Sequence, residues 1–341
     1  LADLLLAPFT PSNTARSGGT IYPIIANLPP LYGSKPNDPS ARKIGSYLMW
    51  VAITAACITS SMFLSALAPN LLALALVKSI VGINISWGTW FIAFLPLGLL
   101  LILTMPLLAY WFYPPEVKVN DEVPLWAARE LEKLGKLSRN EILLLVFVCF
   151  ALMMWIFAAQ WIEPAMAALL IIGLMLWTGV LEWSDITGNK AAWNTFVWFA
   201  TLVALADGLS STGFIGWLGK EGGLLMSGIS PGVATIVLLL AFYLLHYLFA
   251  STTAHTTALL PAMLTIASTI PGMNMNVFVL LMVTSLGIMG IITPYGTGPS
   301  PIYYGSGYLP TKDYWRLGTI FGGIFLVALL VIGYPWMSMM F

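Results

Sequence analysis

The stretch FTPSNTARSGGTIYP, residues 9–23, decides the fold, because it is polar within a strongly apolar sequence. It gathers Ser12, Asn13, Thr14 and Arg16 beside prolines and glycines, which interrupt helices. Of the 341 residues, 59% are hydrophobic and 8% are charged, whereas soluble domains carry about 25% charged residues. A polar, helix-breaking segment in such a chain predicts an interruption in a membrane-spanning structure.

Several apolar segments are about 18 residues or longer, which is the length that a helix needs to cross a bilayer. A soluble domain could not bury so many of them, so we predict an all-α polytopic membrane protein. The zero net charge gives no indication of nucleic-acid binding. Cys57 and Cys149 lie in apolar runs and indicate neither a disulfide framework nor a metal site, and we expect no cofactor. The chain starts within an apolar element without methionine, so we expect it to lack N-terminal helices of a longer protein.

A second polar tip, STTAH at 251–255, matches the first tip, SNTAR at 12–16. Each is followed by an apolar helix with a proline-containing break, at 68–70 and 293–296, and then by a long span. Two such units predict an inverted-repeat transporter with two re-entrant hairpins and two broken helices. Basic residues gather in the loops of one predicted side, which is typical of cytoplasmic loops. The two hairpins then enter from opposite faces and meet near the membrane midplane.

The predicted organisation has two halves joined by a charged segment. The first half, 1–113, holds a hairpin at 1–30, a broken helix at 44–83 and a span at 87–113. Residues 114–140 form a charged linker at the cytoplasmic surface of the membrane. The second half, 141–341, holds spans at 141–159, 164–182 and 193–218, a hairpin at 231–270, a broken helix at 274–308 and a span at 315–340.

The two tips and the two breaks form the candidate substrate site. Backbone groups freed within a bilayer must line a cavity or be buried in protein, and helix N-termini offer N–H donors to an anion. Short hydroxyl and amide side chains add further donors, so the pattern favours a small carboxylate. The candidate substrate-binding residues are Ser12, Asn13, Thr14, Ser251, Thr252, Thr253, Pro69, Asn70, Thr293 and Pro294.

Arg16 and His255 occupy matching positions, four residues after the serine of each tip. A charged group at bilayer depth is costly, so it normally has a partner or a function. We expect both residues to compensate the charge of a dicarboxylate. The alternatives are structural bonds to carbonyls for Arg16 and a neutral hydrogen-bonded ring for His255. The sequence leaves the roles of Lys78, Asp207 and His246 open.

At SNTARSGGTIYPII, FASTTAHTTALLP and GIITPYGTGPSPIYYGSGY the chain resembles the divalent anion:sodium symporter family. The likeness covers essentially all of the chain and is greatest for the branch of bacterial citrate/succinate and tartrate/succinate antiporters and plastid 2-oxoglutarate/malate translocators. It implies an elevator-type secondary transporter, usually a homodimer, in a bacterial inner membrane or a plastid envelope. The family's substrate-binding Ser-Asn-Thr motifs fall on 12–14 and 251–253, and its break loops fall near 66–70 and 292–294.

The chain departs from the family pattern at Thr252, where the family has asparagine. Sodium-coupled members hold sodium between tips and breaks, whereas here Arg16 and His255 follow the tips. We therefore expect side-chain charge in place of sodium, and obligatory exchange of one anion for another. The alternative is a sodium- or proton-coupled dicarboxylate symporter.

Two other classes are not favoured. A membrane enzyme would need a catalytic set. The sequence has no HExxH signature, and its one GxSxG match, GISPG at 228–232, does not follow a predicted strand as a catalytic serine of that motif would. A channel would need a continuous pore rather than two closed hairpin tips. The sequence does not distinguish citrate, succinate, tartrate, malate and 2-oxoglutarate as substrates.

Overall fold

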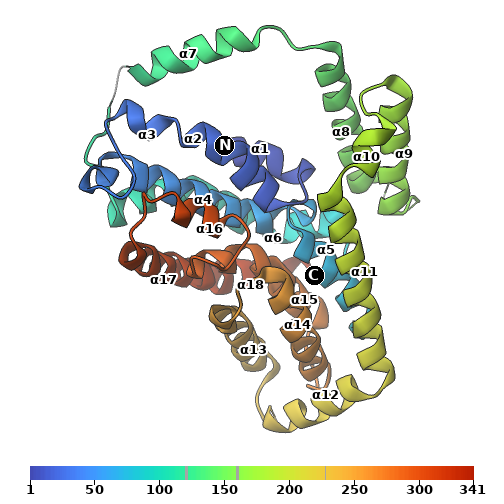
Figure 1. Ribbon diagram of the computed structural model, residues 1–341. Coiled ribbons are helices and arrows are strands. Elements are labelled where there is room, and N and C mark those ends of the chain that lie inside the picture. Colours follow the sequence, from blue (N-terminus) through green and yellow to red (C-terminus); the bar gives the residue numbers. More distant parts are fainter. Residues whose placement is uncertain (120–121, 159–160, 227) are drawn as a thin grey trace. The chain divides into compact units, whose positions relative to one another are not determined.

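The computed structural model describes residues 1–119, 122–158, 161–226 and 228–341, and these residues form helices and no strand. Two compact units are present. The first unit comprises Leu1–Asn84, Trp90–Asn120 and Leu202–Phe341, and the second comprises Ile85–Thr89 and Asp121–Thr201 (Figure 1). The first unit contains both polar tips and both breaks, so it combines elements from both predicted halves.

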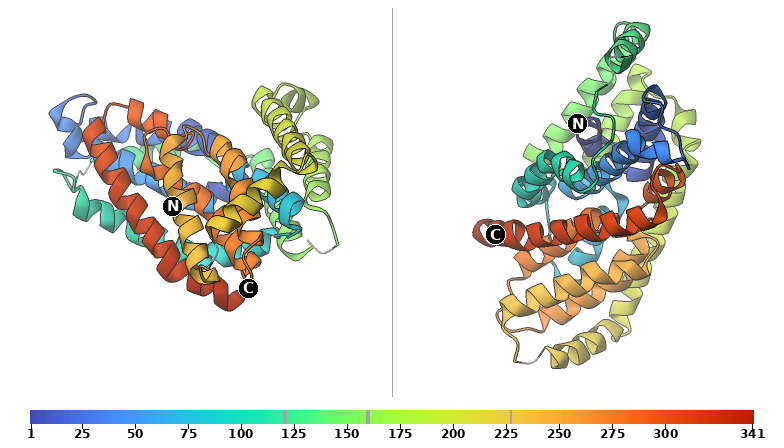
Figure 2. Two further views of the ribbon diagram at one scale, coloured as in Figure 1. Left: turned by 90° about the horizontal axis from the view of Figure 1, so that it is seen from below. Right: turned by 90° about the vertical axis from the view of Figure 1, so that its left-hand side faces the viewer.

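Six helices in the described part of the chain are long and apolar enough to cross a membrane, which confirms the prediction of a polytopic all-α protein. They are Gly45–Met62 (α4), Trp87–Phe112 (α6), Arg139–Phe157 (α8), Pro231–Leu248, Met275–Ile292 and Thr311–Met340. The last combines α17 (Thr311–Ala328), a π-helical turn (Leu329–Gly333) and α18 (Tyr334–Met340), which Figure 2 shows as one long helix.

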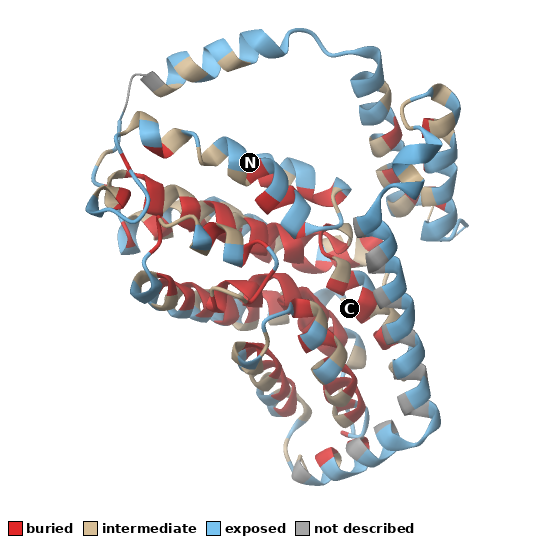
Figure 3. Cartoon of the chain, viewed as in Figure 1, coloured by how far each residue is buried: buried red, intermediate tan, exposed pale blue. Residues whose placement is uncertain are grey.

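Burial separates central helices from outer ones. The spanning windows of α4 and of Met275–Ile292 are 83% and 89% buried, whereas that of α6 is only 33% buried. On α6, Leu103, Leu107 and Trp111 form an exposed apolar stripe at helical spacing. Such a stripe is costly in water and suited to contact with lipid. Figure 3 shows the buried residues concentrated in α4, α14 and α15.

The first hairpin consists of two arms joined by a tip at residues 10–13. Its ascending arm is α1 (Ala2–Leu6) with a 3-10 turn (Ala7–Phe9). Its returning arm is a π-helix (Thr14–Ile21), then α2 (Tyr22–Ile25) and α3 (Leu28–Leu31). Prolines at positions 23, 29 and 30 keep these last pieces short, because each removes a backbone donor.

The first broken helix is interrupted earlier than the sequence predicted. Helix α4 ends at Met62, the break at 63–67 contains a 3-10 turn (Leu64–Ala66), and α5 (Ala68–Val81) follows. Residues 68–70, predicted as the break, instead begin α5, because proline is tolerated in the first turn of a helix, where its missing N–H has no helical partner. Asn70 then ties the two pieces together by donating to the carbonyls of Ser60 (2.8 Å) and Phe63 (3.2 Å).

The second hairpin consists of α13 (Pro231–Leu245), a 3-10 turn (His246–Leu248), a tip at 249–251 and α14 (Thr252–Ser268). The second broken helix consists of α15 (Met275–Ile288), a 3-10 turn (Met289–Ile292), a break at 293–299 and α16 (Ser300–Gly305). Helices α4 and α15 pack against each other at the centre of the unit, and α5 packs along α14.

The remaining helices are α7 (Glu122–Leu134), α8, α9 (Pro164–Thr178), α10 (Trp183–Thr187), α11 (Lys190–Ser211) and α12 (Phe214–Leu225). A small core of Phe147, Ala151, Ile171 and Met175 joins α8 to α9. The span predicted at 193–218 is divided between α11 and α12, with Gly213 in the left-handed conformation between them. The side chain of Asp207 lies outside those that the structure describes. Lys78 is exposed in the last turn of α5.

Candidate functional site

Both polar tips reach the second break, at neighbouring residues. The Asn13 side-chain amide donates to the Thr297 hydroxyl at 2.7 Å, and the Thr252 hydroxyl donates to the Gly296 carbonyl at 3.1 Å. Asn13 and Thr252 are the second residues of their tip motifs, and both are buried. The structure therefore brings the two tips together, although they lie more than 200 residues apart in the chain.

The serines of the two tips cap the helices that follow. Ser12 Oγ accepts from the Ala15 N–H at 3.2 Å, and Ser251 Oγ accepts from the Ala254 N–H at 3.4 Å. The hydroxyl groups thus start the π-helix at Thr14 and α14 at Thr252. The other first-turn N–H groups have no helical acceptor, and with the helix dipole they make each tip suited to an anion.

Glycine at position 298 allows tip and break to approach closely. A Cβ atom built there would overlap the side chain of Thr14. Thr14 itself is exposed, and Thr253 of the other tip is half-buried. The break backbone therefore passes directly beside the first tip, where any larger side chain would displace it.

Arg16 is fully buried and uses all of its N–H groups. Its Nε donates to Asp3 at 3.1 Å in an ion pair. Its terminal nitrogens donate to the carbonyls of Thr10 and Ala66 and to the hydroxyls of Thr59 and Ser60. The Thr59 hydroxyl in turn donates to the second carboxylate oxygen of Asp3. This network, the Arg16 clamp, joins both arms of the first hairpin to α4 and the first break.

The ion pair changes the expectation for Arg16. A guanidinium beside a buried carboxylate adds little net charge to its surroundings, so Arg16 is not an isolated cation. Sequence reasoning missed Asp3, although it stands in an apolar arm only 13 residues before Arg16. An acidic residue at membrane depth was itself the signal, because such a group normally has a charged partner.

His255 is fully buried in an aromatic setting next to the second tip. Its ring lies 4.3 Å from Phe242, 4.9 Å from His246 and 5.2 Å from Phe249, measured between ring centroids. Neither of its ring nitrogens has a hydrogen-bond partner among the described residues. His246, by contrast, bonds through Nε2 to the Gly296 carbonyl at 2.7 Å. The sequence singled out His255, but it is His246 that holds the break.

Some buried polar atoms near the tips and breaks make no hydrogen bond with other described residues. Within the described part of the chain, Oδ1 of Asn70 and Oγ1 of Thr293 have no partner. Buried polar groups in native proteins are nearly always hydrogen-bonded, so such atoms are suited to a ligand. Pro69 is buried and Pro294 is half-buried, and neither has an N–H to offer.

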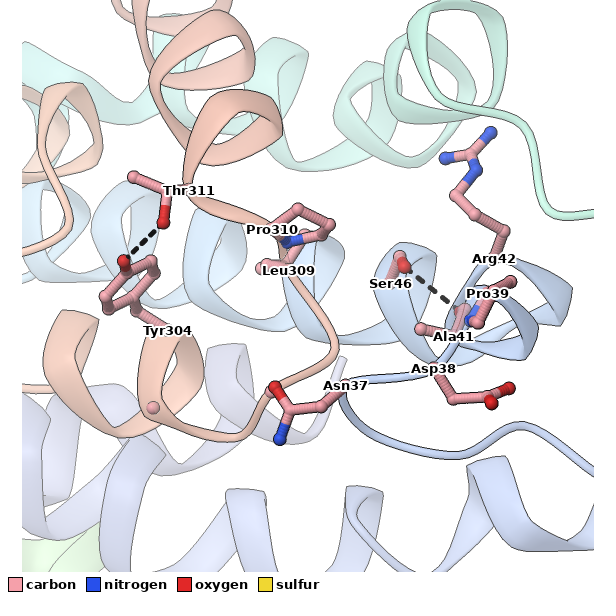
Figure 4. A pocket seen from close by; sticks show the side chains of 12 residues that line it. Asn37, Asp38, Pro39, Ala41, Arg42, Ser46, Tyr304, Leu309, Pro310 and Thr311 are labelled. Atoms are coloured by element: carbon pink, nitrogen blue, oxygen red, sulfur yellow. Dashed lines mark hydrogen bonds between the residues drawn. The ribbon is translucent and has the colours of Figure 1, made fainter.

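A surface pocket of about 610 Å³ lies elsewhere, between residues 37–46 and residues 304–311 (Figure 4). Its charged side chains do not converge on one point. Arg42 points away, donates to the Pro114 carbonyl and lies 3.6 Å over the Tyr113 ring. Asp38 accepts hydrogen bonds from Ser40, which lower the pKa of its carboxyl group. The pocket contains none of the predicted substrate-binding residues, so we do not assign the substrate to it.

Replacing Asn13 by alanine tests the contact between the first tip and the second break. The change removes a buried hydrogen bond and leaves the Thr297 hydroxyl without its donor, which costs about 1–3 kcal/mol. We expect transport to fall about tenfold or more. Asn27→Ala is the matched control, since Asn27 is exposed and bonds only locally, to the Pro23 carbonyl. Equal transport rates for the two variants would contradict the proposed importance of this contact.

Comparisons with known proteins give one consistent result. The family described as the sodium:sulfate symporter transmembrane region matches residues 1–341. An L-tartrate/succinate antiporter of Escherichia coli (strain K12) is 52% identical over 336 residues, which are 98% of this chain and 69% of the relative. The L-tartrate/succinate antiporters of Escherichia coli (strain UTI89 / UPEC) and Shigella sonnei (strain Ss046) are also 52% identical, over 338 and 336 residues, with 69% of each relative covered.

Proposed function

The chain belongs to the sodium:sulfate symporter family, and on this basis we propose that it exchanges dicarboxylates across a membrane as an antiporter. The identity of 52% to L-tartrate/succinate antiporters over nearly its whole length carries the proposal. The six apolar helices and the bacterial relatives make it a multi-pass protein of a bacterial inner membrane. Tartrate and succinate are the proposed substrates, and transport rather than catalysis is the proposed activity.

The proposed site is the region where the two tips meet the breaks. It offers first-turn N–H groups at two helix starts, the amide of Asn13, the hydroxyls of both tips and the unpartnered hydroxyl of Thr293. The unpartnered Oδ1 of Asn70 can only accept a hydrogen bond, so it suits a hydroxyl group of the substrate and not a carboxylate. The donor groups suit a molecule with a carboxylate at each end, because each tip can take one carboxylate. Charge-assisted hydrogen bonds to a carboxylate are about twice as strong as neutral ones, which favours this use of the donors.

The contacts of the two hairpins support an inverted repeat. The returning arm of the first hairpin bonds to α16, after the second break, through Ser17 and the Tyr303 hydroxyl at 2.9 Å. The returning arm of the second hairpin, α14, packs along α5, after the first break. Each hairpin thus pairs crosswise with the broken helix of the other half. We propose that this crossed assembly moves as the transport domain of an elevator carrier in a homodimer.

Charge compensation is proposed to rest mainly on His255. Arg16 is already paired with Asp3, whereas His255 is buried beside the second tip without a hydrogen-bond partner in the described residues. Burial without a hydrogen-bond partner disfavours the protonated ring, so we propose that His255 takes up a proton only when the dianion lies beside it. This compensation uses no sodium, and the preference for exchange over net transport rests on the likeness to antiporters.

Counterflow in liposomes tests the function. The full-length protein is reconstituted, the vesicles are loaded with succinate or left without it, and labelled tartrate or succinate is added outside in sodium-free buffer. We expect uptake into loaded vesicles and almost none into unloaded ones, because the return step needs an anion.

Two other results would change the conclusion. Uptake into unloaded vesicles that requires sodium would replace exchange by sodium-coupled symport. Uptake driven by a proton gradient alone would indicate a proton-coupled symporter. Absence of uptake under all three conditions, with the protein shown to be folded in the vesicles, would contradict dicarboxylate transport itself.

A further inference from the structure

Each break in the two halves has one carbonyl that accepts a hydrogen bond from a buried cationic or imidazole side chain. In the first break, Arg16 Nη1 donates to the Ala66 carbonyl at 2.9 Å. In the second break, His246 Nε2 bonds to the Gly296 carbonyl at 2.7 Å. By position in the tip motifs His255 matches Arg16, but by contact it is His246 that matches it. His246 lies in the 3-10 turn just before the second tip and is fully buried.

The acceptor fixes which ring nitrogen of His246 donates. A carbonyl oxygen can only accept, so Nε2 must carry the proton of this hydrogen bond. The same carbonyl also accepts from the Thr252 hydroxyl at 3.1 Å. Two donors from opposite sides of the second tip, one before it and one at the start of α14, therefore hold a single atom of the break.

The position of Gly296 matters because the next residue serves the other tip. Thr297 accepts the hydrogen bond of Asn13, and a Cβ at Gly298 would overlap Thr14. A shift of the Gly296 carbonyl would therefore move the residues that the first tip contacts. His246 thus influences both tips through its hydrogen bond to the second break.

We propose that His246 is a positioning residue of the transport site: its Nε2–H holds the Gly296 carbonyl, so that the second break meets both tips in the geometry that binds the anion. This inference rests on the proposed dicarboxylate exchange. It assigns His246 a neutral donor role and leaves charge compensation to His255. A carbonyl held by two donors is also poorly placed to bind a sodium ion, which fits exchange without sodium.

Two substitutions at position 246 separate hydrogen bonding from packing. Glutamine can place an amide N–H near the position of Nε2, whereas leucine fills similar space without a donor. In succinate-loaded liposomes we expect His246→Gln to retain exchange within about threefold of the unsubstituted protein, and His246→Leu to lose about tenfold, mainly as a raised KM, because one buried hydrogen bond is lost. The pH profile of His246→Gln should match that of the unsubstituted protein.

Equal activity of the glutamine and leucine variants would overturn the proposal, and so would a pH profile that changes in His246→Gln. The amount of folded protein in the vesicles is measured for each variant. If His246→Leu does not fold, a cycle between His246→Ala and Thr252→Val replaces it. Since the two donors share one acceptor, we expect the double variant to lose more than the product of the single losses.

A loss of exchange activity in the double variant that equals the product of the two single losses would also overturn the proposal. The unsubstituted protein serves as the reference throughout. Its failure to exchange dicarboxylates would count against the proposed function. Normal exchange by the unsubstituted protein with no difference between glutamine and leucine would count against the role of His246 alone.

Discussion

Asp3→Ala is expected to destabilise the protein by about 3–5 kcal/mol, because it removes one partner of a buried ion pair and leaves the other charge uncompensated. Arg16 is fully buried and Asp3 is 5% exposed, so solvent cannot replace the lost carboxylate. The Thr59 hydroxyl, which donates to Asp3, would keep only the carbonyls of Ala55 and Ala56 as acceptors. Thermal or denaturant unfolding of the purified protein measures the effect, and we expect a strongly lowered midpoint.

Two further variants make this result specific. Glu132→Ala removes the same charge from an exposed position in α7 and is expected to change the free energy of unfolding by less than about 0.5 kcal/mol. Asp3→Ala combined with Arg16→Met removes both charges and should be more stable than Asp3→Ala alone, because no unpaired charge remains. An Asp3→Ala protein that unfolds like the unsubstituted protein would show that the Arg16 clamp does not support the hairpin.

The sequence predicted the helical membrane class and most of the helices, because long apolar runs and their interruptions are local features. The sequence prediction placed the first break at the wrong residues, and the cause was again a local feature. Pro69 was taken as a helix breaker, but it lies in the first turn of α5, where proline is favoured. The break at 63–67 contains neither proline nor glycine, so composition gave no sign of it. Its irregular backbone is held by tertiary contacts from Arg16 and Asn70.

The candidate site shows the same division between local and long-range information. The tips were recognisable as matching motifs, and the structure places Asn13 and Thr252 at adjacent residues of the second break. Which residues they contact depends on packing between segments more than 200 positions apart, and a single sequence contains no direct record of that. The contact of His246 was missed for this reason, since it is defined by its partner and not by a motif. Asp3 was missed although an acidic residue in an apolar arm was a local signal.

Gly287→Ala is expected to cost about 3 kcal/mol, because α4 and α15 cross there with backbone in contact. A Cβ at Gly287 would stand 2.6 Å from the Ser61 hydroxyl and 2.7 Å from the Cys57 carbonyl, and would also overlap the Ser61 backbone nitrogen. The same crossing holds a hydrogen bond from the Ile288 N–H to the Ser61 hydroxyl at 2.9 Å. Separating the helices would therefore lose packing and this bond together. Denaturant unfolding and transport in liposomes both measure the loss.

We expect Gly287→Ala to destabilise the protein because the new Cβ meets backbone atoms, which cannot move aside as a side chain can. A second substitution tests this explanation. Ser61→Ala in the Gly287→Ala protein removes only the hydroxyl, while the Ser61 nitrogen and the Cys57 carbonyl stay in place, so we expect it not to restore stability. Gly323→Ala in α17 is the control, because a Cβ there has no atom within 4 Å and alanine favours a helix by about 1 kcal/mol.

Helices α4 and α15 lead into the two breaks. A crossing between them that cannot tolerate one methyl group keeps the two breaks at a fixed separation, and the two tips with them. Wild-type stability of Gly287→Ala would mean that this crossing can open, and that the tips are held together by their own contacts with the second break and the broken helices.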